Sequence, residues 1–326
     1  MERQEHYAVK VIVFLGAFVF LLLFFSAQLL QKQLKPDLRQ RVQVDIQRSP
    51  FNRERAAKDL ESILSGAGPR PAGSPGVEIA RGYLRKEAQR AGFALSEYPF
   101  ETAAPSGKVA CASLMVRVRG TLPGVILVGT PLDTPVVDGK PILGANAAGA
   151  GTAWLLEMAR MLGSHRSGRS LWLVWYDGTQ TPGKGREFVE LLRASGELGQ
   201  VEAVINVAEI GDCFLSVASD PLAPSWLRDC VWGMARDLVY DRHFSEAGPA
   251  AAAVEPSFRA CGMPCLDLVD YPFGGTVVQH RELWHSAQDT ADRVCPESLQ
   301  AIADVLYYSL VPLEAQLDVL ARERVR

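Results

Sequence analysis

One apolar run organises the pattern of the chain. Residues 171–176 read Leu-Trp-Leu-Val-Trp-Tyr, without a charged or strongly polar interruption. Because successive residues of a strand point to opposite faces, this run predicts a strand buried on both faces, at the centre of a sheet. The run ends at Asp177-Gly178, and the crevice of an open α/β sheet lies beyond the carboxyl ends of such strands. Thr179 and Gln180 therefore face the predicted crevice, and both are uncharged.

Shorter apolar segments, separated by turn-forming residues, surround this run. They predict further strands at 95–100, 109–118, 125–128, 203–207 and 264–269. Apolar side chains at helical spacing predict helices at 53–65, 75–91, 144–162, 187–192, 226–238 and 297–311. Strands that alternate with helices indicate a three-layer α/β/α sandwich around one central sheet. We expect this domain to occupy residues 53–315 and a short C-terminal tail to follow at 316–326.

The first thirty residues follow a different pattern. From Val11 to Leu30 the chain is apolar except for Ser26 and Gln28, and about 20 residues of helix cross the ~30 Å hydrocarbon layer of a membrane. The alternative is a cleaved signal peptide, but the run is long for one, and Phe25 stands where cleavage after Ala27 requires a small residue. We expect a tail at 1–10, an uncleaved transmembrane helix at 11–30 and a polar linker at 31–52.

The basic residues around the predicted span and the cysteines indicate on which side of the membrane the domain lies. Arg3 and Lys10 precede the span, whereas basic residues at 32, 35, 39 and 41 follow it, so a positive-inside count favours an inside domain. Long domains translocate despite such charges, and we favour an extracytoplasmic domain (periplasmic, lumenal or extracellular), where disulfides are possible. The cysteines are Cys111, Cys213, Cys230, Cys261, Cys265 and Cys295. They allow about 15 full pairings, and none has CxxC spacing.

Composition narrows the class of protein. The chain has 326 residues, 48% of them hydrophobic, which is enough for one large core. Its formal net charge is −3 and it has no basic stripe, which argues against nucleic acid as a partner. We find no GxSxG elbow, no P-loop and no dinucleotide-binding fingerprint, and His280 and His285 lack the HExxH spacing of a zinc helix.

Five loops should meet at the crevice, at 129–134, 144–147, 177–180, 206–211 and 283–290. Within and around them stand Gly68-Pro-Arg-Pro-Ala-Gly-Ser-Pro75, the Leu-Leu-Glu-Met-Ala-Arg run at 155–160, Tyr-Asp-Gly at 176–178, the segment from Ser257 to Asp270, Trp284-His285 and Asp289-Thr290. In these motifs and their order the chain resembles the M28 zinc aminopeptidases and, more closely, their relatives the glutaminyl-peptide cyclotransferases. The resemblance covers residues 53–312 and implies a mostly parallel mixed sheet.

The resemblance also implies where zinc ligands and catalytic carboxylates should stand. The expected His falls on Pro131, the metal-bridging Asp on Ala147, the pair of Glu on Thr179 and Gln180, and the Asp of the next strand end on Ala208. Further carboxylates of the cyclotransferase branch fall near Ala252 and Ala253. Asp133 and His285 remain at ligand-like or supporting positions, with Trp284 as the pocket aromatic. These fall short of the three protein ligands that a catalytic zinc takes.

Neighbouring residues do not replace the missing groups in this interpretation. Glu209 follows Ala208, and since successive strand residues point to opposite faces, we expect Glu209 to point away from the crevice. The remaining polar residues have structural roles open to them. We expect Asp133 to brace a turn, Asp177 to organise its own loop, Trp284 to lie in the core and His285 to hydrogen-bond a loop carbonyl.

The sequence therefore predicts a membrane-tethered pseudoenzyme without metal, other cofactor or catalytic residue. Its vestigial pocket comprises Pro131, Asp133, Ala147, Asp177, Thr179, Gln180, Ala208, Trp284 and His285. We expect it to serve as a binding or scaffold subunit with a membrane-protein partner, its crevice holding a peptide N-terminus or filled by its own side chains. The alternative is an active zinc aminopeptidase or glutaminyl-peptide cyclotransferase with relocated ligands such as Asp133, Asp138, Asp212 and His285.

Overall fold

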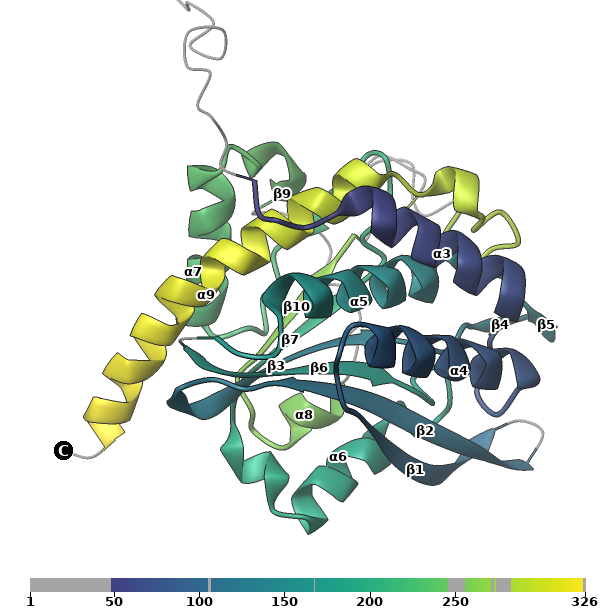
Figure 1. Ribbon diagram of the computed structural model, residues 1–326, viewed down its shortest axis with the longest axis horizontal. Helices are drawn as coiled ribbons and strands as arrows, with labels where there is room; N and C mark the ends of the chain where they lie inside the picture. The colour runs from purple at the N-terminus through teal and green to yellow at the C-terminus, as the bar shows by residue number, and fades with distance from the viewer. Residues whose placement is uncertain are drawn as a thin grey trace, which may run out of the picture. The chain divides into compact units, whose positions relative to one another are not determined.

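The structure is a computed structural model (Figure 1). It describes residues 48–104, 107–166, 168–245, 256–270, 273 and 283–324. The predicted transmembrane helix at 11–30 lies outside the described residues, as do Ala252, Ala253 and His280. Among the residues described, no helix combines the length and the apolar character that crossing a membrane requires.

A six-stranded mixed sheet forms the middle layer. Its spatial order is β1 (Leu95–Ala104), β2 (Gly107–Val118), β6 (Arg169–Tyr176), β3 (Leu122–Pro131), β7 (Val201–Ala208) and β10 (Cys265–Val269). β2 pairs antiparallel with β1 and with β6, whereas the pairs β6–β3, β3–β7 and β7–β10 are parallel. Two short pairs lie outside this sheet: β4 (Val136–Val137) with β5 (Lys140–Pro141), and β8 (Val217–Ala218) with β9 (Phe244–Ser245).

Helices cover both faces of the sheet, which confirms the predicted three-layer fold. One hydrophobic cluster joins the sheet to α3 (Arg53–Ala67), α4 (Pro75–Arg90), α5 (Gly151–Leu162), α7 (Ser225–Asp237) and α9 (Pro296–Arg324). A second cluster joins the opposite face to α6 (Arg186–Ala194) and α8 (Pro256–Ala260). Figure 1 shows α3, α4 and α5 on one side of the strands and α6 and α8 on the other. Single turns complete the chain: η1 (Ala145–Ala150), η2 (Glu197–Gln200), η3 (Asp241–His243) and η4 (Ala291–Arg293).

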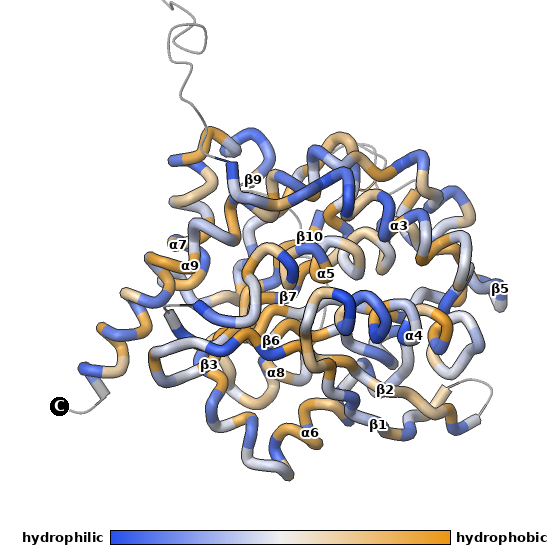
Figure 2. The backbone as a smooth tube through the Cα atoms, viewed as in Figure 1, coloured by the Kyte–Doolittle hydropathy of each residue, from blue (hydrophilic) through white to orange (hydrophobic). Residues whose placement is uncertain are grey.

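The apolar run of residues 171–176 behaves as the pattern predicts. Leu171, Leu173 and Trp175 pack in the first cluster, whereas Trp172, Val174 and Tyr176 pack in the second. Each of these side chains is buried. Figure 2 shows the hydrophobic colour concentrated on the central strands. β6 is thus an interior strand that contributes to both halves of the core.

Local chemistry explains where the helices begin. The side chain of Asn52 accepts a hydrogen bond from the N–H of Arg55, and Ser74 accepts one from the N–H of Val77, as N-caps do. The helix predicted after residue 144 begins as the π-helical turn η1 and becomes α-helical at Gly151. A Cβ at Gly151 would lie 2.1 Å from the Thr130 hydroxyl oxygen, so the helix approaches β3 too closely for a side chain there.

The last helix is longer than the sequence pattern indicates. α9 continues to Arg324, through Pro312 and past residue 315, where we placed the end of the domain. Leu313 and Leu317 are buried, so the apolar face of the helix continues into the segment that we expected to be a tail.

A disulfide bond joins the loop after β7 to the start of α9. Cys213 and Cys295 are 82 residues apart in sequence, with Cα atoms 4.9 Å apart, and the other four cysteines form no disulfide. Two hydrogen bonds lie beside this link. The N–H of Cys295 donates to the Gly211 carbonyl over 2.8 Å, and the Ser298 hydroxyl donates to the Asp212 carbonyl over 2.6 Å. The loop at 211–213 is therefore fixed to α9 both covalently and by hydrogen bonds.

This link gives a testable thiol count. We expect the unfolded, unreduced protein to react with four equivalents of a thiol reagent and the reduced protein with six. The double variant Cys213→Ser/Cys295→Ser should lose about 4 kcal/mol of unfolding free energy, because the closed loop of 82 residues no longer restricts the unfolded chain. Cys230→Ser, which breaks no disulfide, is the control in chemical denaturation. Six reactive thiols without reduction would contradict the assignment.

Candidate functional site

The carboxyl ends of the parallel strands lie along one edge of the sheet. Pro131 at the end of β3 is in register with Tyr176 at the end of β6. Ala208 at the end of β7 is likewise in register with Val269 at the end of β10. The loops that follow these four strands therefore start side by side, as expected for the crevice of an open α/β sheet.

Asp133 braces the loop after β6, as predicted. Its Oδ1 accepts hydrogen bonds from the Thr179 N–H over 3.0 Å and from the Thr179 hydroxyl over 2.7 Å, and its Oδ2 accepts one from the Gln180 N–H over 2.9 Å. Burial and the charge of Asp177 raise the pKa of Asp133, and the three donated bonds partly offset this. Both oxygens of this carboxyl group are thus engaged within the crevice wall.

Asp177 organises its own loop, again as predicted. Its Oδ2 accepts hydrogen bonds from the Arg81 guanidinium over 2.6 Å and from the Ala112 N–H over 2.9 Å. Its Oδ1 accepts one from the Gly178 N–H over 2.8 Å. Burial raises the pKa of Asp177, against the opposing effects of the Ala112 N–H and of Arg81. This carboxyl group ties β2 and α4 to the end of β6.

Asp289 holds the turn that contains Ala147. Its two oxygens accept hydrogen bonds from the N–H groups of Asn146 and Ala147, over 2.6 Å and 3.1 Å. The Asn146 side chain continues the connection, because its Oδ1 accepts from the Gly211 N–H and its Nδ2 donates to the Glu209 carbonyl. Burial raises the pKa of Asp289 to about 6, although the two backbone N–H groups lower it. The loops after β5 and β7 are thereby joined.

The direction of the Glu209 side chain differs from the sequence prediction. We expected its side chain to point away from the crevice, but its Oε1 accepts a hydrogen bond of 2.7 Å from Trp284 Nε1. The prediction was wrong because alternation holds only within a strand. β7 ends at Ala208, and Glu209 has a left-handed backbone with φ of +56°. Position 208 carries no acid, but the next residue, Glu209, directs its carboxylate toward the aromatic pair Trp284 and His285.

Trp284 and His285 form that aromatic pair. Their rings stack with centroids 3.6 Å apart and planes 12° apart, and neither side chain is fully buried. His285 Nε2 lies 3.6 Å from Glu209 Oε1, so the imidazole faces a carboxylate rather than the loop carbonyl that we expected. His285 is also left-handed, with φ of +49°. Nothing in a single sequence signals a left-handed Glu or His, so this contact was not predictable.

Asp270 is a second acid that the sequence analysis did not select. It follows Val269 at the end of β10 and is fully buried, and neither side-chain oxygen accepts a hydrogen bond of normal geometry, although the Ser216 N–H lies near the carboxyl group. Burial raises the pKa of Asp270 well above its ordinary value, and the charges of Asp212 and Glu209 raise it further. The Ser216 N–H offsets only part of this effect.

The residues present do not fit the zinc that the resemblance implies. Pro131, Ala147 and Ala208 carry no metal-binding side-chain atom, and the Thr179 hydroxyl donates to Asp133. In the part of the chain that the structure describes, no three or more His, Cys, Asp or Glu side chains are arranged to hold a metal ion.

The relocated ligand set is not brought together either. Asp138 is exposed in the turn between β4 and β5, and both Asp133 oxygens are hydrogen-bonded to the loop after β6. Asp212 uses one oxygen to accept the Phe214 N–H over 3.0 Å. His285, the fourth candidate, contacts the carboxylate of Glu209, which is not one of the four.

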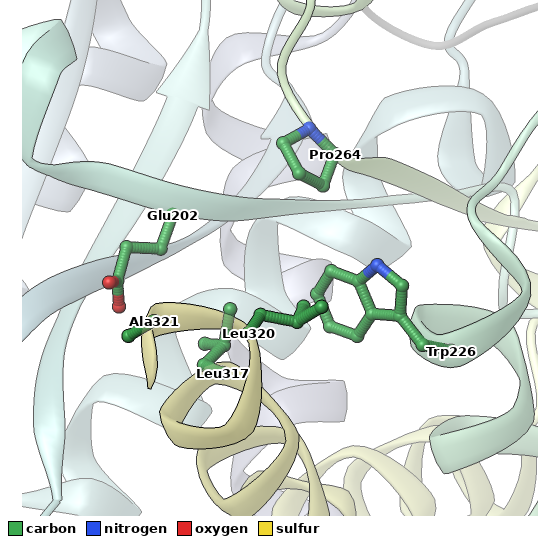
Figure 3. Close-up of a pocket in the computed structure, with 6 residues that line it drawn as sticks. All are labelled: Glu202, Trp226, Pro264, Leu317, Leu320 and Ala321. Atoms are coloured by element: carbon green, nitrogen blue, oxygen red, sulfur yellow. The ribbon is translucent and has the colours of Figure 1, made fainter. Parts of the chain in front are cut away.

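A small apolar cavity lies at the opposite edge of the sheet (Figure 3). Its volume is about 120 Å³, and it is lined by Glu202, Trp226, Pro264, Leu317, Leu320 and Ala321. Glu202 stands at the amino end of β7 and Pro264 directly before β10, so the cavity is separate from the crevice. A cavity of this volume can hold several water molecules or a small apolar group.

Comparison with known proteins places this geometry in a family context. The family model described as Peptidase family M28 matches residues 114–310. No curated protein matches the chain by sequence.

Solved structures extend the similarity to the whole described domain. A glutaminyl cyclase from an Acidobacteriales bacterium is 26% identical, with a TM-score of 0.75, over 83% of this chain and 98% of that chain. A glutaminyl cyclase from Porphyromonas gingivalis is 21% identical, with a TM-score of 0.71, over 80% of this chain and 98% of that one. A Zn-dependent exopeptidase from Parabacteroides distasonis is 20% identical, with a TM-score of 0.68, over 78% and 96%.

The raised pKa of Asp270 predicts a pH dependence of stability. Between the ordinary carboxyl pKa near 4 and the higher folded value, the unfolded chain loses its proton first, so folding becomes less favourable as pH rises. Asp270→Asn removes this titration. We expect the difference in unfolding free energy, variant minus wild type, to increase by up to about 1.4 kcal/mol for each pH unit above pH 4. Urea denaturation at pH 4 to 7 measures this gain, and parallel pH profiles would exclude it.

Proposed function

We propose, starting from the premise that this chain belongs to peptidase family M28, that it is a catalytically inactive member and serves as a binding or scaffold subunit of a membrane-associated assembly. The loop at 177–180 carries the proposal. Thr179 and Gln180 stand where the resemblance places a metal-binding and a catalytic glutamate, and both direct their backbone N–H groups to Asp133. The loop at 177–180 is thus hydrogen-bonded to Asp133 in the neighbouring loop at 129–134.

The chemistry of these side chains supports the loss of catalysis. A threonine hydroxyl does not act as a general base near neutral pH, and a neutral amide neither moves a proton nor holds zinc as a carboxylate does. Three of the crevice acids, Asp133, Asp177 and Asp289, accept two or more hydrogen bonds each from the crevice walls. These three carboxyl groups stabilise the loops.

The crevice retains groups suited to binding. Trp284 and His285 present a stacked aromatic surface that is partly exposed, and Glu209 places a carboxylate against it. An aromatic surface beside an acid suits a ligand with a positively charged amino group, such as a peptide N-terminus. This combination supports a binding role for the crevice without requiring catalysis.

The membrane association rests on the sequence of residues 11–30, an apolar stretch of spanning length. The disulfide between Cys213 and Cys295 supports an extracytoplasmic domain, because disulfides persist in oxidising compartments and are rare in the cytosol. Phe14, Phe18, Leu21 and Phe25 share one face at helical spacing, which offers a contact for a helix of a membrane-protein partner.

One observation favours the alternative, an active zinc aminopeptidase or glutaminyl-peptide cyclotransferase with relocated ligands. His285 Nε2 and Glu209 Oε1 lie 3.6 Å apart, close enough to share a small ligand. A catalytic zinc takes three protein ligands, and these two residues supply two. Zinc content therefore separates the two functions.

We expect the purified full-length protein, dialysed without chelator, to contain much less than one zinc per chain by elemental analysis. It should show no chelator-sensitive aminopeptidase activity and no cyclisation of N-terminal glutamine, because the donors at the family positions are missing. One tightly bound zinc per chain, with activity lost on chelation, would establish the active alternative.

A matched variant serves as the positive control for zinc content. Pro131→His, Ala147→Asp, Thr179→Glu, Gln180→Glu and Ala208→Asp together restore the side chains that the resemblance places at the metal. The restored variant should take up zinc and gain thermal stability when zinc is added, because metal that binds only the folded state stabilises it.

Membrane association is tested by comparing the full chain with a chain that begins at Arg48. The full chain should stay with membranes after alkaline extraction and enter solution only with detergent, whereas the shorter chain should stay soluble. Mild-detergent purification of the full chain should recover a membrane protein in stoichiometric amount. Recovery of the full chain by itself, or its release by alkali, would contradict the proposed assembly.

A further inference from the structure

The outward face of α9 carries an apolar stripe. Tyr308, Val311, Pro312, Ala315 and Val319 recur at helical spacing, which places them on one side of the helix. Val311 is 73% exposed and Val319 is 44% exposed. Ala315 is exposed as well, and Tyr308 and Pro312 are partly exposed. The face of α9 that packs in the hydrophobic core uses other residues of the helix.

The acidic residues in this part of α9 do not interrupt the stripe. Glu314 forms an ion pair with Arg166 over 2.5 Å, and Asp318 forms one with Arg169 over 2.9 Å. Both arginines belong to the segment that leads into β6, so both ion pairs lie on the same flank of the helix. The next exposed charge along α9 is Arg322, beyond the end of the stripe. The outward face therefore stays uncharged over three turns.

The N-terminal end of the described chain leads to this stripe. Arg53 forms an ion pair at the first turn of α9, and Ser49 donates from its N–H and its hydroxyl to Asp304 over 2.8 Å and 2.6 Å. The Tyr308 hydroxyl then donates to the Arg48 carbonyl over 3.4 Å. Followed toward the N-terminus, the chain runs along α9 and ends beside the first residue of the stripe (Figure 1).

This end point bears on what the stripe contacts. The apolar run at 11–30 has the length of a membrane span, and only residues 31–47 separate it from Arg48. Because an extended chain covers at most about 3.5 Å per residue, such a tether would hold Arg48 within about 60 Å of the membrane. A tether of this length gives the lipid a high local concentration, so a surface too weak to bind free vesicles can still bind the bilayer of its own anchor.

A lipid surface fits the stripe better than another protein does. Specific protein interfaces bury about 800 Å² on each partner, and five partly exposed side chains, three of them Val or Ala, fall well short of that area. A helix that lies on a membrane needs an uninterrupted apolar side, with tyrosines and basic residues at the level of the headgroups. Tyr307 and Tyr308 stand at one end of the stripe with ring centroids 5.0 Å apart, and the exposed Arg48 and Arg322 lie at its two ends.

We propose that the stripe formed by Tyr308, Val311, Pro312, Ala315 and Val319 rests on the lipid surface to which the chain is tethered. This inference rests on the proposed membrane association and names the surface of the domain that meets the lipid. Since no described helix has the length and apolar character to cross a membrane, α9 lies on the interface with one side only.

The test is photo-crosslinking of the full-length protein in vesicles of phosphatidylcholine, with and without phosphatidylglycerol. The probes are Val311→p-benzoylphenylalanine and Val319→p-benzoylphenylalanine. Ile79→p-benzoylphenylalanine is the matched control, because Ile79 is an apolar residue of α4 that is 51% exposed. Mass spectrometry should find lipid adducts at least about fivefold more often at 311 and 319 than at 79, because a side chain seated in the interface stays in contact with lipid. A higher yield with phosphatidylglycerol assigns part of the contact to Arg48 and Arg322, and equal yields assign it to the apolar stripe.

Substitutions of Ala315 test the same contact in opposite directions. With the probe at 311, Ala315→Asp should lower the lipid adduct yield at least about fivefold, because a carboxylate is unfavourable in an apolar contact. Ala315→Leu should raise the yield, because it extends the apolar surface. Ile79→Asp places the same charge on another surface and should leave the yield at 311 unchanged.

Flotation of the same samples with the vesicles separates failure of the inference from failure of the tether. Protein that floats but gives no more lipid adduct at 311 and 319 than at 79 overturns the inference while the tether stands. Cross-links from 311 to a second copy, or to residues 31–47 of the same chain, also overturn it, because they assign the stripe another occupant. Protein that does not float rejects the membrane association and the inference together.

Discussion

Burial of β6 on both faces is the constraint from which the rest of the molecule follows. Its side chains alternate between two hydrophobic clusters, so the strand offers no face on which a polar group can meet water. Functional groups are therefore confined to the loops at the strand ends, and five acids gather there: Asp133, Asp177, Glu209, Asp270 and Asp289. When it is buried in this way, each carboxyl group must accept hydrogen bonds, pair with a basic side chain or remain protonated.

The crevice acids divide by how they meet that requirement. Asp133 receives three hydrogen bonds, Asp177 an arginine and two backbone N–H groups, and Asp289 two backbone N–H groups. These acids hold the crevice loops in place. Glu209 and Asp270 are not satisfied in this way, although one Glu209 oxygen accepts from Trp284. The chain thus combines a crevice wall braced by acids with two carboxyl groups that lack such donors.

The sequence alone predicted what depends on local rules. The apolar run of β6, the caps at Asn52 and Ser74 and the bracing by Asp133 follow from side-chain chemistry within short segments. The orientation of Glu209 was missed because strand alternation ends with the strand, and a left-handed glutamate has no sequence signature. Asp270 becomes its neighbour only through the register of β7 with β10, and the Cys213–Cys295 pairing only through the tertiary fold.

The connection between the loop after β7 and α9 has a mechanical consequence. The Cys213–Cys295 bond and the contacts at Gly211 and Asp212 fix the start of α9 to the segment that follows Glu209. α9 has 29 residues, a length of about 43 Å at the usual rise per residue. Because buried Leu313 and Leu317 anchor the helix further along, α9 ties the crevice loop to the hydrophobic core over much of its length.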